Sequence, residues 1–375
     1  MKNLLYILFS VFFCVSSAFS VNVTSIESLR QRVQGASAEL TSSDKAVIAD
    51  FWSDALGQMF LSKSSREIVE IRRQLEEQKG SESLSYYATA YVAHARSDIQ
   101  AAFQDLKAEQ MDSQQRLMIT HNLMVLTAKL KSSQLSPVAL QHLGDQDDLM
   151  RYWAYKAVTQ RAVIEELTSD VTRDDKTVEA ILKALEQKVL TEPQPEIRKM
   201  VIHFCSAFDH SLARKILLSI AAERISAYKD WTIQDESQDA SLLITLGAAA
   251  ELQSDSDVKA SFGRAFAELY ALAIQRYMKG GEMLSSDQID RLKTVIAEVD
   301  QTALNKTMGV KTGILPAVRN GRGLDREYET LFGDKMRPGK LAVKYTFDYG
   351  KDASGKPVTA PPQLGPAPEN LAESD

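Results

Sequence analysis

The chain has little cysteine and little histidine, and both scarcities limit its chemistry. Cysteine occurs only at Cys14 and Cys205 of the 375 residues. If the N-terminal segment that carries Cys14 is removed, no intramolecular disulfide can form. The five histidines form no zinc-protease helix motif, and none pairs with a cysteine at zinc-finger spacing. The sequence therefore predicts neither a metal site nor another cofactor.

Catalytic motifs are also missing. No Gly-x-Ser-x-Gly string marks a serine nucleophile. The segment Gly309–Gly313 lacks the spacing of a phosphate-binding loop and has no strand before it. The formal net charge of −6 argues against general nucleic-acid binding. We therefore predict no catalytic residue and no nucleic-acid partner.

The first twenty residues have the three-part plan of a secretory signal. Lys2 gives a positive start, residues 4–15 are almost all apolar, and Ala18 and Ser20 supply small residues before a cleavage point. The apolar run is shorter than the roughly 20 residues needed to span a bilayer. We expect cleavage near Ser20/Val21 and a periplasmic or extracellular protein that is not integral to the membrane after cleavage.

Prolines are rare before residue 300, where only Pro137, Pro193 and Pro195 occur. Proline breaks helices, so the long stretches without it permit helices. Apolar residues recur in these stretches at three- and four-residue steps, which predicts an all-α protein. Residues 21–300 are expected to form one helical domain. The predicted helices span 24–33, 43–60, 64–78, 84–108, 113–131, 147–168, 175–189, 195–208, 211–228, 238–252, 257–278 and 286–298.

Several helix starts share a pattern: an acidic or turn residue, a basic residue in the first turn, and then an apolar stripe. The basic residues are Arg116, Arg151, Arg198 and Lys259, separated by 35, 47 and 61 positions. Over about residues 112–275 this pattern resembles HEAT repeats, whose two-helix units recur every ~40–47 residues. The resemblance implies a right-handed α-solenoid of antiparallel helix pairs, with the basic residues linking neighbouring units. Another helical bundle or hairpin array and an α/α toroid are the alternatives.

The C-terminal part differs in composition. Residues 301–350 are expected to form a glycine-containing basic loop over 305–324, a short helix at Asp325–Phe332 and a strand at Leu341–Tyr349. A turn at Asp352–Gly355 would return the chain as a second strand of a β-hairpin. Residues 351–375 are rich in proline, which predicts a disordered tail.

The basic loop is the best candidate for a binding surface. Glycines allow backbone N–H groups to point in one direction, and arginines bind carboxylates or phosphates with two hydrogen bonds. An anionic lipid headgroup, an acidic polysaccharide or an acidic protein face would fit, unless the arginines pair with the acidic helical body. Trp231 is a further candidate, because it is expected at the transition from a helix to a loop, where a partner can reach it. The candidate binding residues are Lys306, Lys311, Arg319, Arg322, Arg326 and Trp231.

These observations lead to three functional hypotheses. The first is an exported, non-enzymatic scaffold or adaptor that binds a protein partner through a helical-repeat surface. The second is a polysaccharide-acting enzyme of the α/α-toroid type, with tyrosine and histidine as acid and base. The third is a binder of anionic envelope lipid or glycan through residues 306–326.

Overall fold

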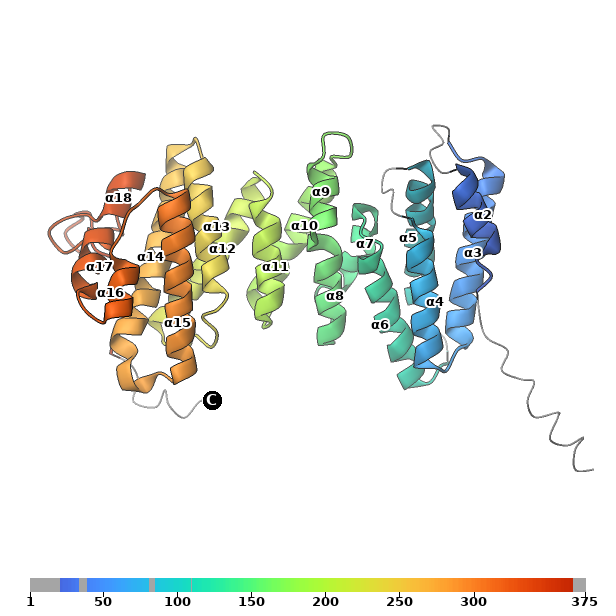
Figure 1. Ribbon diagram of the computed structural model, residues 1–375, viewed down its shortest axis with the longest axis horizontal. Coiled ribbons are helices and arrows are strands. Elements are labelled where there is room, and N and C mark those ends of the chain that lie inside the picture. Colours follow the sequence, from blue (N-terminus) through green and yellow to red (C-terminus); the bar gives the residue numbers. More distant parts are fainter. Residues whose placement is uncertain (1–20, 34–38, 81–84, 109, 367–375) are drawn as a thin grey trace, which may run out of the picture. The chain divides into compact units, whose positions relative to one another are not determined.

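The structure is a computed structural model that describes residues 21–33, 39–80, 85–108 and 110–366 (Figure 1). Within these ranges the regular structure is helical and no strand forms. The prediction of an all-α protein is therefore confirmed. The predicted signal, residues 1–20, lies outside the described residues. The chain divides into two compact units, Met1–Leu167 and Thr168–Asp375.

The helices of the first unit pack as neighbours along the chain and one helix further on, as α3 does with α4 and α5. Most of them begin at the residues expected from the sequence. The elements are α2 (Thr24–Val33), α3 (Ser42–Leu61), α4 (Ser65–Gln78), α5 (Tyr86–Ala108), α6 (Ser113–Lys129), η1 (Ser133–Leu135), α7 (Ser136–Ala139), η2 (Leu140–His142), α8 (Asp148–Thr159) and α9 (Arg161–Thr168).

Side chains at the N-caps explain several of these starts. Thr41 and Asp44 form a capping box on α3, in which each side chain accepts from the other residue's backbone N–H. Asp112 and Asp147 cap α6 and α8 by accepting backbone N–H groups of the first turn. One predicted helix, 147–168, is instead two, because Gln160 between α8 and α9 has an extended backbone.

An aromatic cluster forms the core of the first unit. Trp52 and Tyr91 are fully buried with ring centroids 5.3 Å apart, and Tyr87 stacks on Tyr91. The Tyr91 hydroxyl donates to the Leu75 carbonyl at 2.7 Å and the Tyr87 hydroxyl to that of Gln78 at 2.9 Å. These bonds satisfy carbonyls in the last turn of α4, which have no partner within the helix.

The second unit is built around one long helix, α14, whose Phe262, Phe266 and Tyr270 are fully buried. Helices α12, α13, α15 and α18 all pack against it. The elements are α10 (Asp175–Lys188), η3 (Val189–Thr191), α11 (Pro195–Ser206), α12 (Ser211–Lys229), α13 (Asp239–Leu252), α14 (Ser256–Gly280), η4 (Gly281–Met283), α15 (Ser286–Glu298), η5 (Val299–Thr307), α16 (Ile314–Asn320), α17 (Leu324–Phe332) and α18 (Lys340–Tyr345).

Buried ion pairs fix the connection between α12 and α13. The guanidinium of Arg224 pairs with the Asp239 carboxylate at 2.7 Å, and Tyr228 donates to the same carboxylate at 2.7 Å. Glu236, which is fully buried, pairs with Arg276 of α14 at 3.2 Å and with Arg291 of α15 at 3.1 Å. Charges removed from water in this way need partners, so these contacts hold the connection in one position.

The predicted strand at Leu341–Tyr349 is wrong, because residues 340–345 form helix α18. Leu341 and Tyr345 are four residues apart and both buried, so they lie on one helical face against α14. Gly263 of α14 provides the room, since a Cβ there would lie 2.7 Å from the Tyr345 Cβ. The predicted hairpin is reduced to a turn, with one isolated bridge between Lys351 and Pro357.

Two further expectations for the C-terminal part are corrected. The region 305–324 is not mostly loop, since η5 extends to Thr307 and α16 spans Ile314–Asn320. Residues 360–366, expected within the disordered tail, are packed: Leu364 is buried and its N–H donates to the Gln275 side chain at 2.7 Å. We call residues 360–366 the C-terminal segment. The rest of the expected tail, 367–375, lies outside the described residues.

Candidate functional site

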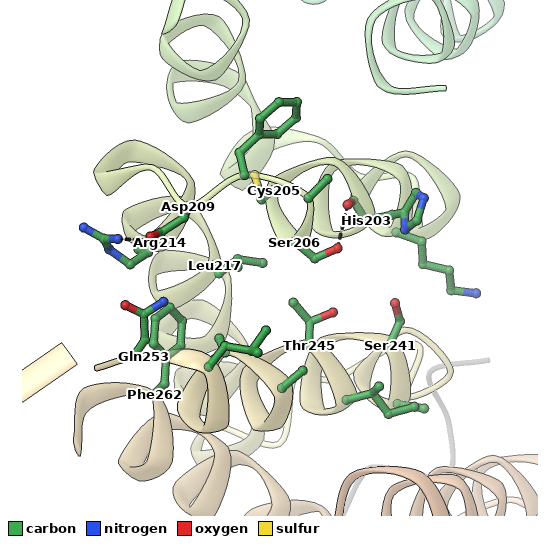
Figure 2. A pocket seen from close by; sticks show the side chains of 18 of the residues that line it. His203, Cys205, Ser206, Asp209, Arg214, Leu217, Ser241, Thr245, Gln253 and Phe262 are labelled. Carbon is green, nitrogen blue, oxygen red and sulfur yellow. Dashed lines mark hydrogen bonds and ion pairs between the residues drawn. The ribbon is translucent and has the colours of Figure 1, made fainter. Parts of the chain in front are cut away.

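The second unit contains an open groove with a volume of about 960 Å³. Its two walls are α11 and α13, and we call it the α11–α13 groove. In Figure 2, Ser206 on α11 and Ser241 and Thr245 on α13 point into the space between the two helices. Leu217 of α12 and Phe262 of α14 also line it.

Apart from Ser241 and Thr245, the α13 wall is apolar although no other described helix covers it. The helix reads Asp239–Leu252 as DASLLITLGAAAEL, and its apolar residues go all the way round. A helix of this kind is normally buried on every side. Ile244, Ala248 and Ala249 are nevertheless partly exposed in the groove, and Leu252 is 83% exposed at its end. The small side chains leave room for another helix to approach.

Charged groups stand at the rim of the groove. Arg214 and Asp209 form an ion pair at 2.5 Å, and Lys199 pairs with Glu196 at 2.9 Å. These pairs are partly exposed and contribute little to stability. The groove therefore has an apolar floor and a polar edge, which is the usual layout of a protein–protein contact.

Two groups with reactive atoms in the groove, Cys205 and Ser206, are not activated as nucleophiles. Burial raises the pKa of the Cys205 thiol far above its usual value, so it stays protonated and is a poor nucleophile. The Ser206 hydroxyl donates to the backbone carbonyl of His203 at 2.7 Å, not to an imidazole. No set of three His, Cys, Asp or Glu side chains in the described part of the chain is placed to hold a metal ion.

Comparison with known proteins gives no relative. No known protein family, curated protein or solved structure matches this chain. Among the described helices, none has the length and apolar character needed to cross a membrane.

The basic residues predicted to bind are spread over several elements. Lys306 is in the last turn of η5, Lys311 lies in the loop before α16, Arg319 is on α16, Arg322 is in the turn after it, and Arg326 is on α17. All five are exposed. Within the described ranges none of them forms an ion pair, so pairing with the acidic helical body does not neutralise them there.

Trp231 is not available to a partner in this structure. It is only 5% exposed, and its indole N–H donates to the Gly365 carbonyl of the C-terminal segment at 3.3 Å. The Arg276 guanidinium lies 5.3 Å from its ring centre. Trp231 also has a positive φ of 59°, which is unusual for a residue with a side chain. The segment that covers Trp231 is over 130 residues away in the sequence, so the residues around Trp231 did not predict its burial.

The repeated basic residues at helix starts share a local geometry. Arg151 donates to the Asp145 carbonyl at 2.9 Å, and Arg198 donates to the Glu192 carbonyl at 2.8 Å. Both therefore bind the turn before their own helix. Arg198 also pairs with Glu223 of α12 at 2.8 Å. Arg116 reaches the carbonyl of the residue before its N-cap at 3.5 Å.

The fourth member departs from this geometry. The Lys259 ammonium lies 5.9 Å from the centre of the Tyr345 ring, which is a cation–π contact with α18.

Proposed function

We propose that this chain is a helical-repeat adaptor that binds an apolar helix of a protein partner in the α11–α13 groove. The observation that carries the proposal is the exposed apolar wall of α13, where small side chains face the groove beside Leu252. A partner helix laid in such a groove would bury its own apolar face there. The proposal includes export of the protein, which the N-terminal segment predicts.

A HEAT-like solenoid architecture is part of the proposal. The shared contacts of Arg151 and Arg198 with the preceding turn support it, because equivalent residues of a repeat are expected to make equivalent contacts. The ion pair between Arg198 of α11 and Glu223 of α12 supports the predicted role of the basic residues in joining neighbouring helices. Nothing in the groove favours the polysaccharide-acting enzyme.

A pair of matched substitutions tests the adaptor hypothesis. Ala248→Arg places a long charged side chain in the groove, whereas Ala222→Arg adds the same side chain at an exposed position of α12. Partners that co-purify with the native protein should be lost with Ala248→Arg and kept with Ala222→Arg, when both variants have native circular dichroism. Equal retention by both variants would contradict the use of this groove.

A second candidate function rests on a separate observation. The five exposed basic side chains of residues 306–326 have no ion-pair partner in the described part of the chain, which favours an anionic lipid or glycan. Changing Arg319, Arg322 and Arg326 together to Glu should abolish binding of such a ligand. Unchanged binding would exclude this surface.

A further inference from the structure

A tight turn just before α18 holds one large apolar side chain in solvent. Met336 is 85% exposed, the highest value among the exposed large apolar residues of the described chain. The Asp334 carboxylate accepts the backbone N–H groups of Met336 and Arg337 at 2.7 and 2.8 Å, and the Asp334 N–H donates to the Arg337 carbonyl. Thr359 donates to the Asp334 carbonyl at 2.6 Å. The turn is therefore fixed, and Met336 is held out at its tip.

A second apolar side chain is exposed on the helix that follows. Val343 of α18 is 66% exposed, while Leu341 and Tyr345 hold the opposite face of the helix against α14. Lys340 precedes Val343 by three residues, so the two side chains are neighbours on the helix surface. The Lys340 ammonium donates to the backbone carbonyl of Lys311 at 3.0 Å, which fixes the direction of the Lys340 side chain.

Basic residues flank both apolar side chains in the sequence. The stretch from residue 335 to 347 contains Lys335, Arg337, Lys340 and Lys344 and no acidic residue. Lys344 pairs with Glu251 at 2.9 Å, and Arg337 lies 3.8 Å from the Asp334 carboxylate. Lys335 and Lys340 form no ion pair with any described residue.

We propose that the turn at Asp334–Arg337 and helix α18 form a contact surface for an anionic lipid membrane. Met336 and Val343 enter the boundary between headgroups and acyl chains, and the flanking lysines and arginine bind the lipid phosphates. Isolated apolar side chains among lysines suit a lipid surface better than a protein, because lysine is depleted from protein–protein interfaces. These residues are distinct from those of the α11–α13 groove and of the segment 306–326, apart from Lys311.

Vesicle co-sedimentation tests the proposal on the protein that begins at Val21, so that the apolar run before it does not contribute. We expect binding to vesicles of phosphatidylglycerol and phosphatidylcholine that weakens as salt is added, and little binding to phosphatidylcholine alone. Met336→Ser should weaken binding about tenfold, the low end for losing one buried apolar side chain. Lys335→Glu should weaken it about fivefold or more. The matched control Val171→Ser removes an apolar side chain that is 83% exposed and lies outside both proposed surfaces, and it should change nothing.

A fluorophore readout separates insertion from simple charge attraction. Met336→Cys can be labelled selectively with an environment-sensitive dye, because Cys205 is buried. A blue shift on anionic vesicles, absent when the dye is at Val171→Cys, is expected. Three results would overturn the proposal: no binding to anionic vesicles, loss on charge reversal while Met336→Ser and Val343→Ser bind normally, or dependence on Arg319, Arg322 and Arg326 alone. The last result would instead support the second candidate function.

Discussion

Substitution of Gly263 by alanine tests the packing of α18 on α14. A Cβ at this position would lie 2.7 Å from both Cβ and Cγ of Tyr345. The Tyr345 Cβ is fixed to the backbone of α18, so the helix itself must move. Overpacking of this kind costs ~1–3 kcal/mol, against which alanine in a helix gains ~0.8–1 kcal/mol over glycine. We expect Gly263→Ala to lower the free energy of unfolding of the second unit by up to about 2 kcal/mol.

Gly57→Ala is the matched control, because Gly57 is within α3, is exposed, and has nothing within 4 Å of the added Cβ. It should stabilise the protein by ~0.5–1 kcal/mol. Urea unfolding followed by circular dichroism compares the two variants. Amide exchange at Val343 and Phe347, which bond to carbonyls within and just before α18, should accelerate only in Gly263→Ala. If both variants stabilise equally, Tyr345 does not pack against Gly263 and our account of α18 is refuted.

Three other outcomes are expected. Asp239→Ala leaves Arg224 buried without its carboxylate partner and should lower the free energy of unfolding in urea by ~3–5 kcal/mol. Arg161→Ala breaks an exposed ion pair and should change it by less than ~0.5 kcal/mol. Similar effects of the two variants would contradict the burial of the Arg224–Asp239 pair. Burial lowers the pKa of His142 below 6.5 in the folded protein. The unfolded chain therefore binds a proton at a higher pH than the folded protein does, so the free energy of unfolding should fall as pH drops through and below 6.5. His142→Gln should flatten this pH dependence, and an unchanged profile in that variant would contradict a contribution from His142. Removing the C-terminal segment should increase acrylamide quenching of Trp231 when the other tryptophans are phenylalanine, and unchanged quenching would mean that the segment does not cover it.

Most helices could be predicted because their signals are local. Apolar residues at three- and four-residue steps and caps such as Asp112 and Asp147 lie within or next to the helix that they define. The start of α3 shows the limit, since Thr41 caps a helix that begins at Ser42, one residue before the predicted start. The alternating apolar residues over Leu341–Tyr349 predicted a strand, but the same residues also place Leu341 and Tyr345 on one helical face. The helix is favoured because Gly263 of α14 leaves room for Tyr345 against it.

The candidate site could not be predicted because it depends on contacts between distant residues. Which face of α13 stays uncovered is set by the packing of α11, α12 and α14 around it. The available signal was the sequence of α13, whose apolar residues lie on all sides of the helix. Such a helix needs other elements packed on every side, and this chain supplies them on only part of its surface. The burial of Trp231 depends likewise on the C-terminal segment, and that segment is anchored by Gln275 in the C-terminal part of α14.

The adaptor hypothesis is tested most directly by photo-crosslinking from inside the groove. A photoreactive amino acid at Thr245 faces the space between α11 and α13, whereas the same residue at Glu179 lies on the exposed surface of α10. Irradiation in cells followed by mass spectrometry of the joined peptides identifies what occupies the groove. The account predicts one dominant adduct from position 245, joined to an apolar helical segment and absent from position 179. The same diffuse adducts from both positions, or none from 245, would contradict it.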